Sequence, residues 1–176
     1  MRFVCLPLIG AVLIEVEPHH DSRGLFARTV CAEEFAAHGI PTEYPQCSTS
    51  FNRYRGTIRG LHFQRPPHEE AKIIRCTSGA IFDVIVDLRG DSDSYGRWYG
   101  VELSQDNRHS IYVPPGFAHG FQTLTDAAEI YYMIGAAYVP AAASGVRWDD
   151  PAIGIRWPLP VSMISDRDAS LPYLQS

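Results

Sequence analysis

The stretch that decides the fold reads Ala80-Ile81-Phe82-Asp83-Val84-Ile85-Val86-Asp87-Leu88. Two interleaved series of residues run through it, and each series takes every second position. A period of two over this length predicts a β-strand, in which successive side chains point to opposite faces. Asp83 and Asp87 belong to the same series, and we expect both carboxylates to face solvent on an exposed surface of a sheet.

The residues on either side extend this β pattern. Short apolar runs separated by turn residues predict several further strands, and many short strands are typical of an all-β barrel or sandwich. Cys31–His38, followed by Gly39, has the composition of a short helix with a glycine just beyond its end. The further predicted strands are Ile73–Cys76, Trp98–Leu103, Ser110–Val113 and Glu129–Ile134. From Pro151 onward we expect irregular structure that wraps over the barrel.

The composition is that of one globular domain spanning residues 1–176, with 45% hydrophobic and 20% charged residues. A net charge of −5 does not suit nucleic-acid binding, which normally requires a basic face. The four cysteines are widely spaced and match neither a disulfide framework nor a zinc motif, so we expect reduced thiols and a cytoplasmic protein. Phe3–Ile14 is apolar but too short to span a membrane, and Pro7 and Gly10 interrupt it. We interpret it as an N-terminal strand rather than a signal peptide.

The segment Gly56–Gln64 places Arg59 and His62 three residues apart in a pattern that otherwise predicts a buried strand. Arginine suits forked recognition of phosphate or carboxylate, and histidine is the side chain that titrates nearest neutral pH. Strict alternation puts these two side chains on opposite faces. Gly60 lies between them, and a bulge at this glycine would bring both to one side. The alternative is a core histidine beside a surface arginine.

Four further segments carry unusual residue combinations: Asp21–Phe26, Pro114–Phe121, Trp148–Pro158 and Ile164–Asp168. Together with Gly56–Gln64 they resemble the dTDP-4-dehydrorhamnose 3,5-epimerase family, in the family's order from roughly Leu13 to the C-terminus. The resemblance implies a cupin-like double-stranded β-helix, a jelly-roll barrel with one or two short helices. It also implies a homodimer in which N-terminal strands extend the partner's sheet, and the apolar segment Val4–Val16 fits that role.

The activity that this resemblance implies is inversion of C3 and C5 in dTDP-4-keto-6-deoxy-D-glucose, which gives dTDP-4-keto-L-rhamnose without a cofactor or a metal. His62 matches the family's general base, and Asp168 matches the carboxylate that orients it. Tyr132 matches the general acid, which returns a proton to the opposite face of the sugar ring. Lys72 matches the lysine whose charge would stabilise the enolate oxygen.

The resemblance also implies a set of substrate-binding residues. Arginines would hold the pyrophosphate, aromatic rings would hold the nucleoside, and a second histidine would lie close to His62 and Asp168. In that order these are Arg23 and Arg59, Phe26 and Tyr138, and His119, while Gln46 and Ser48 stand in the family's Gln-Asp-Asn stretch. Taken singly, His119 could be a turn residue, Tyr132 barrel core and Asp168 a solvated carboxylate.

The sequence departs from the family pattern at two positions near these residues. Met133 follows the presumed acid where the family typically has lysine, and Arg28 stands where it usually has glutamate. We hypothesise that Met133 reshapes ligand preference or proton return. The alternative is that Met133 points into the core, since neighbours on a strand face opposite ways.

Three other functions stay open from sequence. A mono-epimerase would invert only C3 or only C5 of a related nucleotide-linked 4-ketohexose. A metal-dependent cupin would draw ligands from His62, His68, Glu69 and His119, but no His-x-His pair occurs and Arg59 and Lys72 oppose a divalent cation. The third is a sugar-nucleotide-binding module without activity.

Overall fold

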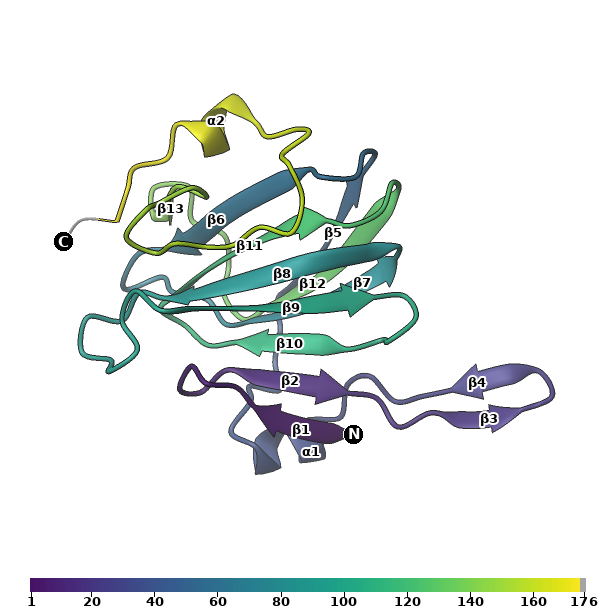
Figure 1. Cartoon of the computed structure of the whole chain (residues 1–176). Helices are drawn as coiled ribbons and strands as arrows, with labels where there is room; N and C mark the ends of the chain where they lie inside the picture. The colour runs from purple at the N-terminus through teal and green to yellow at the C-terminus, as the bar shows by residue number, and fades with distance from the viewer. Residues whose placement is uncertain (175–176) are drawn as a thin grey trace.

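Two antiparallel sheets face each other in the computed structural model, which describes residues 1–174 (Figure 1). Six strands form one sheet in the order β1-β2-β10-β7-β12-β5, and five form the other in the order β13-β6-β11-β8-β9. The predicted all-β class is confirmed. The first sheet contains β1 (Arg2–Cys5), β2 (Val12–Glu15), β10 (Ser110–Val113), β7 (Lys72–Ser78), β12 (Ala128–Ile134) and β5 (Gln46–Asn52). The second contains β13 (Ala143–Gly145), β6 (Ile58–Gln64), β11 (Phe117–Thr123), β8 (Ala80–Asp87) and β9 (Trp98–Ser104).

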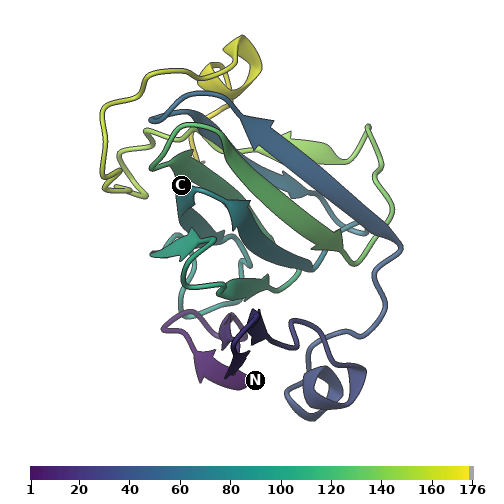
Figure 2. The ribbon, with the colours of Figure 1, turned by 90° about the vertical axis from the view of Figure 1, so that its right-hand side faces the viewer.

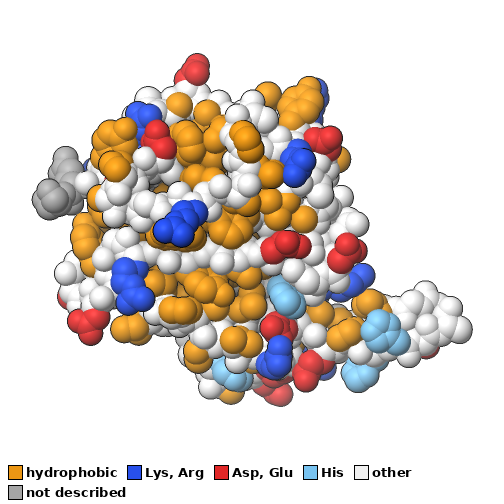
Figure 3. All heavy atoms as spheres, in the orientation of Figure 1, with side chains coloured by type: hydrophobic (Ala, Val, Ile, Leu, Met, Phe, Trp, Pro, Cys, Tyr) orange, Lys and Arg blue, Asp and Glu red, His pale blue; other side chains and the backbone are white. Residues whose placement is uncertain are grey.

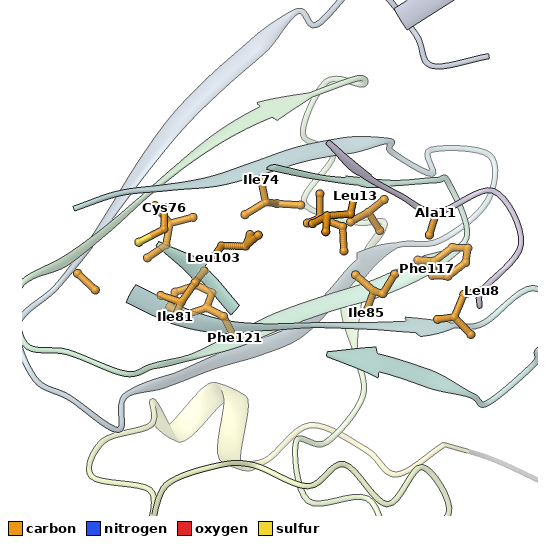
Figure 4. Close-up of a cluster of buried hydrophobic side chains, with 14 residues drawn as sticks. Leu8, Ala11, Leu13, Ile74, Cys76, Ile81, Ile85, Leu103, Phe117 and Phe121 are labelled. Atoms are coloured by element: carbon orange, nitrogen blue, oxygen red, sulfur yellow. The ribbon is translucent and has the colours of Figure 1, made fainter. Parts of the chain in front are cut away.

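The main hydrophobic core fills the space between these two sheets (Figure 4). Ile74 on β7 and Leu13 on β2 meet Ile81 and Ile85 on β8 and Phe121 on β11, and all of them are buried. Burial of one such side chain stabilises the fold by roughly 1.5–3 kcal/mol. The inward series of each strand therefore holds the two layers together.

The outer face of the five-stranded sheet is covered by the C-terminal part of the chain. Val84 and Val86 pack there against Ile153 and the partly buried Trp157. Because this face is apolar and covered, the other series of β8 points inward, and Asp83 and Asp87 are fully buried. The expectation that these carboxylates face solvent was wrong, because β8 is covered on both sides.

The outer face of the six-stranded sheet carries a second apolar cluster around the helix α1 (Ala32–Ala37), which the sequence predicted at Cys31–His38. Phe35 from this helix packs with Ile73 and Tyr112, and Met133 joins the same cluster. Met133 therefore points into a hydrophobic cluster, as in the alternative named above, and lies on the face of β12 opposite to Tyr132. Figure 2 shows α1 and the C-terminal segment on opposite sides of the molecule.

The N-terminal segment forms two strands rather than the single strand we expected. β1 and β2 pair antiparallel, and Gly10, in the turn between them, has a positive φ of 89°. β1 is the edge strand of its sheet. A small hairpin of β3 (His19–Asp21) and β4 (Gly24–Phe26) then projects from the body of the molecule (Figures 1 and 3). No helix in the described part of the chain is long and apolar enough to cross a membrane.

Candidate active site

A cavity of about 300 Å³ lies between the two sheets. Its walls come from β5, β7 and β12 of one sheet and from β6 and β11 of the other, together with short connecting segments. This size is at the lower end of the range for small-ligand sites. The lining residues are Gln46, Ser48, Thr49, Ser50, Arg59, His62, Glu70, Lys72, His119, Gly120, Phe121, Tyr132, Ile134 and Tyr138.

A bulge in β6 brings Arg59 and His62 to the same cavity. On the neighbouring strand, His119 pairs with His62 and Phe121 pairs with Arg59, so the register shifts between them. Gly60 sits at this shift with a φ of +111°, and a Cβ there would come within 2.7 Å of the His119 carbonyl oxygen. Only glycine fits this close approach. The bulge predicted at Gly60 is present.

His62 forms a hydrogen-bonded pair with Asp168. Its Nε2 lies 2.7 Å from Asp168 Oδ1, and the second carboxylate oxygen accepts a hydrogen bond from the Gly60 backbone N–H at 2.9 Å. Burial opposes ionisation of Asp168, but the hydrogen bonds from His62 and Gly60 outweigh it and lower the pKa of this carboxyl. An ionised Asp168 keeps the imidazole proton on Nε2 and leaves Nδ1 as the basic nitrogen.

The C-terminal segment delivers Asp168 to this position. It first runs beside the start of β6, where Ile58 N–H donates to the Met163 carbonyl oxygen at 2.9 Å. The short helix α2 (Asp166–Ala169) follows, and the Ser165 hydroxyl caps it by accepting a hydrogen bond from Asp168 N–H. This helix lies within the tail that we expected to be irregular, and it turns Asp168 inward rather than to solvent.

His119 forms a second pair, and its partner is Asp83. The Nε2 to Oδ2 distance is 2.7 Å, and both side chains are buried. We expected His119 beside His62 and Asp168; it does lie next to His62 in the strand register, but its carboxylate partner is Asp83. The His119 ring also stands edge-on to Tyr132, with ring centroids 5.9 Å apart.

Tyr132 lines the cavity from β12 in surroundings that disfavour its ionisation. Burial is the main cause, the negative charge of Asp83 adds to it, and Arg59 acts in the opposite direction. Together they raise the pKa of the Tyr132 phenol well above its usual range. Tyr132 is therefore a protonated phenol at neutral pH and is able to donate.

Lys72 enters the cavity from the start of β7. Its Nζ lies 2.9 Å from Glu70 Oε1 and donates to the His62 carbonyl oxygen at 3.4 Å. We did not anticipate Glu70, although it stands two positions before Lys72, and that spacing puts both side chains on one side of an extended chain. Thr49, Ser50, Gly120, Phe121 and Ile134 are the other lining residues absent from our expectations.

The predicted ligand-binding residues divide into two groups. Arg59, Gln46, Ser48 and Tyr138 line the cavity. The predicted residues His62, Lys72, His119 and Tyr132 also line it. Asp168 does not, because it lies behind His62. Arg59 is fixed by a 2.7 Å hydrogen bond from its Nε to Asn52 Oδ1, and Gln46 accepts from the Tyr138 backbone N–H.

Arg23 and Phe26 form the second group, because the structure does not bring them to this cavity. Both lie on the projecting β3–β4 hairpin, where Phe26 is 76% exposed and the Arg23 guanidinium pairs with Asp21 at 2.6 Å. The family resemblance predicted these two residues as substrate-binding, but their place in the fold separates them from their own chain's cavity.

The histidines offer no metal centre within residues 1–174, since no three His, Cys, Asp or Glu side chains there are grouped to hold a metal ion. His62 and His119 are each bonded to a carboxylate instead. His68 and Glu69, two of the ligands considered for the metal-dependent alternative, do not line the cavity.

Known proteins resemble this chain along nearly its whole length. The family model described as dTDP-4-dehydrorhamnose 3,5-epimerase matches residues 5–176. The enzyme of that name from Methanothermobacter thermautotrophicus is 44% identical over 170 residues, covering 95% of this chain and 91% of the relative.

Solved structures extend the comparison. The Bacillus anthracis dTDP-4-dehydrorhamnose 3,5-epimerase, with TDP and PPi bound, superposes with a TM-score of 0.95 at 38% identity, covering 98% of this chain and 99% of that one. A 3′-monoepimerase from Streptomyces bikiniensis, in complex with dTDP-quinovose, superposes at 0.89 and 34% identity, covering 97% and 86%. The match of the family model along nearly the whole chain, with relatives of this identity and coverage, shows that the chain belongs to the dTDP-4-dehydrorhamnose 3,5-epimerase family.

Proposed function

We propose that this protein inverts C3 and C5 of dTDP-4-keto-6-deoxy-D-glucose to give dTDP-4-keto-L-rhamnose. The observation that carries the proposal is the His62–Asp168 pair at a cavity that also contains Lys72 and Tyr132. These side chains supply a base, a cation and an acid in one site. The reaction moves protons and leaves the oxidation level of the sugar unchanged, so its chemistry calls for no hydride acceptor.

The first step is removal of a proton from the carbon next to the ketone. His62 takes this proton on Nδ1, and the bonding electrons move toward the ketone oxygen to form an enolate. Asp168 stabilises the resulting imidazolium through its 2.7 Å hydrogen bond. The Lys72 ammonium stabilises the negative oxygen, and this kind of electrostatic contribution is usually the largest in such reactions.

The second step returns a proton to the opposite face of the same carbon. Tyr132 donates it. Burial and the charge of Asp83 raise the pKa of this phenol, so that it carries its proton before the step. Donation from one face after abstraction from the other inverts the stereocentre. The same sequence at the carbon on the other side of the ketone inverts the second centre.

We assign the nucleotide end of the substrate to Arg59 and Tyr138. Arg59 is the guanidinium that lines the cavity, and its hydrogen bond to Asn52 leaves the terminal NH groups available for pyrophosphate oxygens. Tyr138 is 56% exposed and lines the cavity, so its ring can pack against a nucleoside.

We infer that the protein acts as a homodimer. β1 is an edge strand with unpaired backbone groups, and such edges favour pairing with a second chain. The β3–β4 hairpin carries Arg23 and Phe26 away from their own cavity, so these residues would bind substrate only at the site of a second copy. Light scattering at micromolar concentration should give the mass of a dimer, and a monomer would contradict the inference.

We also infer a cytoplasmic location for the protein. Cys5, Cys31, Cys47 and Cys76 are free thiols in the structure, and two of them, Cys5 and Cys47, are exposed. Exposed free thiols suit a reducing compartment. Fractionation of the native cells, with detection of the protein in the soluble cytoplasmic fraction, tests this inference.

The experiment that tests the activity follows hydrogen exchange by NMR in heavy water. With dTDP-4-keto-6-deoxy-D-glucose and no added cofactor, the protein should introduce deuterium at C3 and at C5. If neither C3 nor C5 exchanges in the presence of the protein, the proposed activity is refuted. If only C3 exchanges, the protein is a mono-epimerase, like the Streptomyces 3′-monoepimerase to which it is similar.

A further inference from the structure

Glu70 places a carboxylate inside the cavity, directly on the ammonium of Lys72. The Oε1 to Nζ distance is 2.9 Å, and the two side chains are only 12% and 9% exposed. Within residues 1–174, Lys72 is the sole side chain that forms an ion pair with Glu70. Two opposite charges thus face each other in a site that we expect to receive an anionic ligand.

The loop that carries Glu70 is tied down on both sides of it. On one side, the buried Gln64 side chain donates to the carbonyl oxygens of His68 and Ala137, at 3.0 and 3.2 Å. On the other side, the Ala71 carbonyl oxygen accepts from Gly135 N–H at 2.8 Å. Glu70 therefore stands between two fixed points of the backbone, which suits a residue that must hold a partner in place.

Lysine needs such a partner because its charge sits at the end of a flexible four-carbon stem. The His62 carbonyl oxygen, at 3.4 Å, is a weak second anchor. Without Glu70, the ammonium would be free to turn toward the pyrophosphate of the ligand, the strongest anion in the site. A carboxylate at this point also repels pyrophosphate, so this end of the cavity suits the uncharged sugar.

We propose that Glu70 is a positioning residue that holds the Lys72 ammonium at the ketone oxygen of the sugar. The inference rests on the proposed epimerase function and adds a residue to its machinery. Glu70 acts through Lys72 and transfers no proton itself. Its loss should therefore slow the chemical step without weakening nucleotide binding.

Glu70→Gln tests the role with little change in shape, and Glu69→Gln is the matched control, since Glu69 is the adjacent glutamate and does not line the cavity. We expect Glu70→Gln to lower kcat for exchange at C3 by about ten- to hundredfold, the range that misplacement of a catalytic group produces. Its Kd for dTDP should be equal to or tighter than that of the wild type. Glu69→Gln should match the wild type in both. Equal kcat values for the two variants would overturn the inference.

A double-mutant cycle separates positioning from a merely structural role. If Glu70 works through Lys72, then Glu70→Gln should cause no further loss in a Lys72→Met background. A loss there as large as in the wild type would contradict the proposal, and thermal melting checks that each variant is folded. An inactive wild type would refute the epimerase function itself, whereas an active wild type with an unaffected Glu70→Gln would refute only the role of Glu70.

Discussion

The two histidine–aspartate pairs have the same bond but different access to the cavity. In both, Nε2 lies 2.7 Å from a carboxylate oxygen, and the two histidines are neighbours on adjacent strands. The His62 side chain is 41% exposed, whereas that of His119 is 5% exposed. A ligand can therefore exchange a proton with His62 far more readily than with His119.

The carboxylates of the two pairs differ as well. Both oxygens of Asp168 accept hydrogen bonds, from His62 and from Gly60 N–H. Asp83 uses one oxygen for His119, and its other oxygen is buried without a hydrogen-bond partner in the described structure. Its charge instead acts on Tyr132, where it helps to raise the pKa of the phenol. The exposed His62–Asp168 pair thus suits the role of a base. The buried His119–Asp83 pair suits a different role, which is to keep the Tyr132 phenol protonated.

The largest expected difference is in catalytic rate. His62→Ala removes the base, and loss of general-base assistance typically costs ~10²–10⁴ in rate. His119→Ala removes no base in this scheme. The rate that it loses should therefore be smaller, by about tenfold or more, than the rate lost in His62→Ala. Deuterium exchange at C3 measures both, and Kd for dTDP should be unchanged in His62→Ala. Equal losses from the two substitutions would remove the functional distinction between the pairs.

The second difference is in stability, and it has the opposite order. Asp83→Ala leaves His119 buried without its partner, and breaking a buried pair on one side costs about 3 kcal/mol or more. Asp168→Ala leaves a half-exposed imidazole that water can satisfy, but it also removes the acceptor of the buried Gly60 N–H. The expected cost is therefore about 2 kcal/mol, mainly that of one unsatisfied buried donor. Urea unfolding of the two variants measures this order directly. If Asp168→Ala proved less stable than Asp83→Ala, the buried pair would not be the one that contributes more to the stability of the fold.

Alternation in the sequence was enough to predict the strands but not the direction of their faces. The period of two located β8 and the neighbouring strands because pleating is a local property. Whether Asp83 faces solvent depends on what covers the other face, and that cover comes from residues around Ile153 and Trp157. No local pattern near residue 83 reports on a segment seventy residues away, so the prediction for this carboxylate failed.

The candidate site shows the same division between local and distant information. Gly60 could be read from the sequence as the bend that unites Arg59 and His62, since the cause lies within the same strand. The contact between His62 and Asp168 spans 106 residues, and only the family's order of motifs linked them. Glu70 was missed because a glutamate near the start of a strand is usually solvated, and only the folded loop shows that it meets Lys72.

The smallest expected effect concerns the acid sensitivity of the exposed pair. Hydrogen bonds from His62 and Gly60 outweigh the effect of burial and lower the pKa of Asp168 below its ordinary value of 3.8. A carboxyl whose pKa is lower in the folded state adds stability that is fully present above the unfolded pKa and is lost as the pH falls through the folded pKa. We therefore expect the stability difference between wild type and Asp168→Asn to be constant above about pH 5 and to shrink below about pH 4.

Asp166→Asn is the matched control for this measurement, because Asp166 lies in the same short helix and is exposed. It should leave the free energy of unfolding nearly unchanged at every pH. Asp87 also has a lowered pKa, since hydrogen bonds led by that of Arg89 outweigh its burial, and it contributes to acid unfolding of all three proteins. Its contribution cancels in the difference between wild type and variant. A difference that stays constant down to pH 2, or that Asp166→Asn reproduces, would show that Asp168 does not gain its stabilisation from the bond to His62.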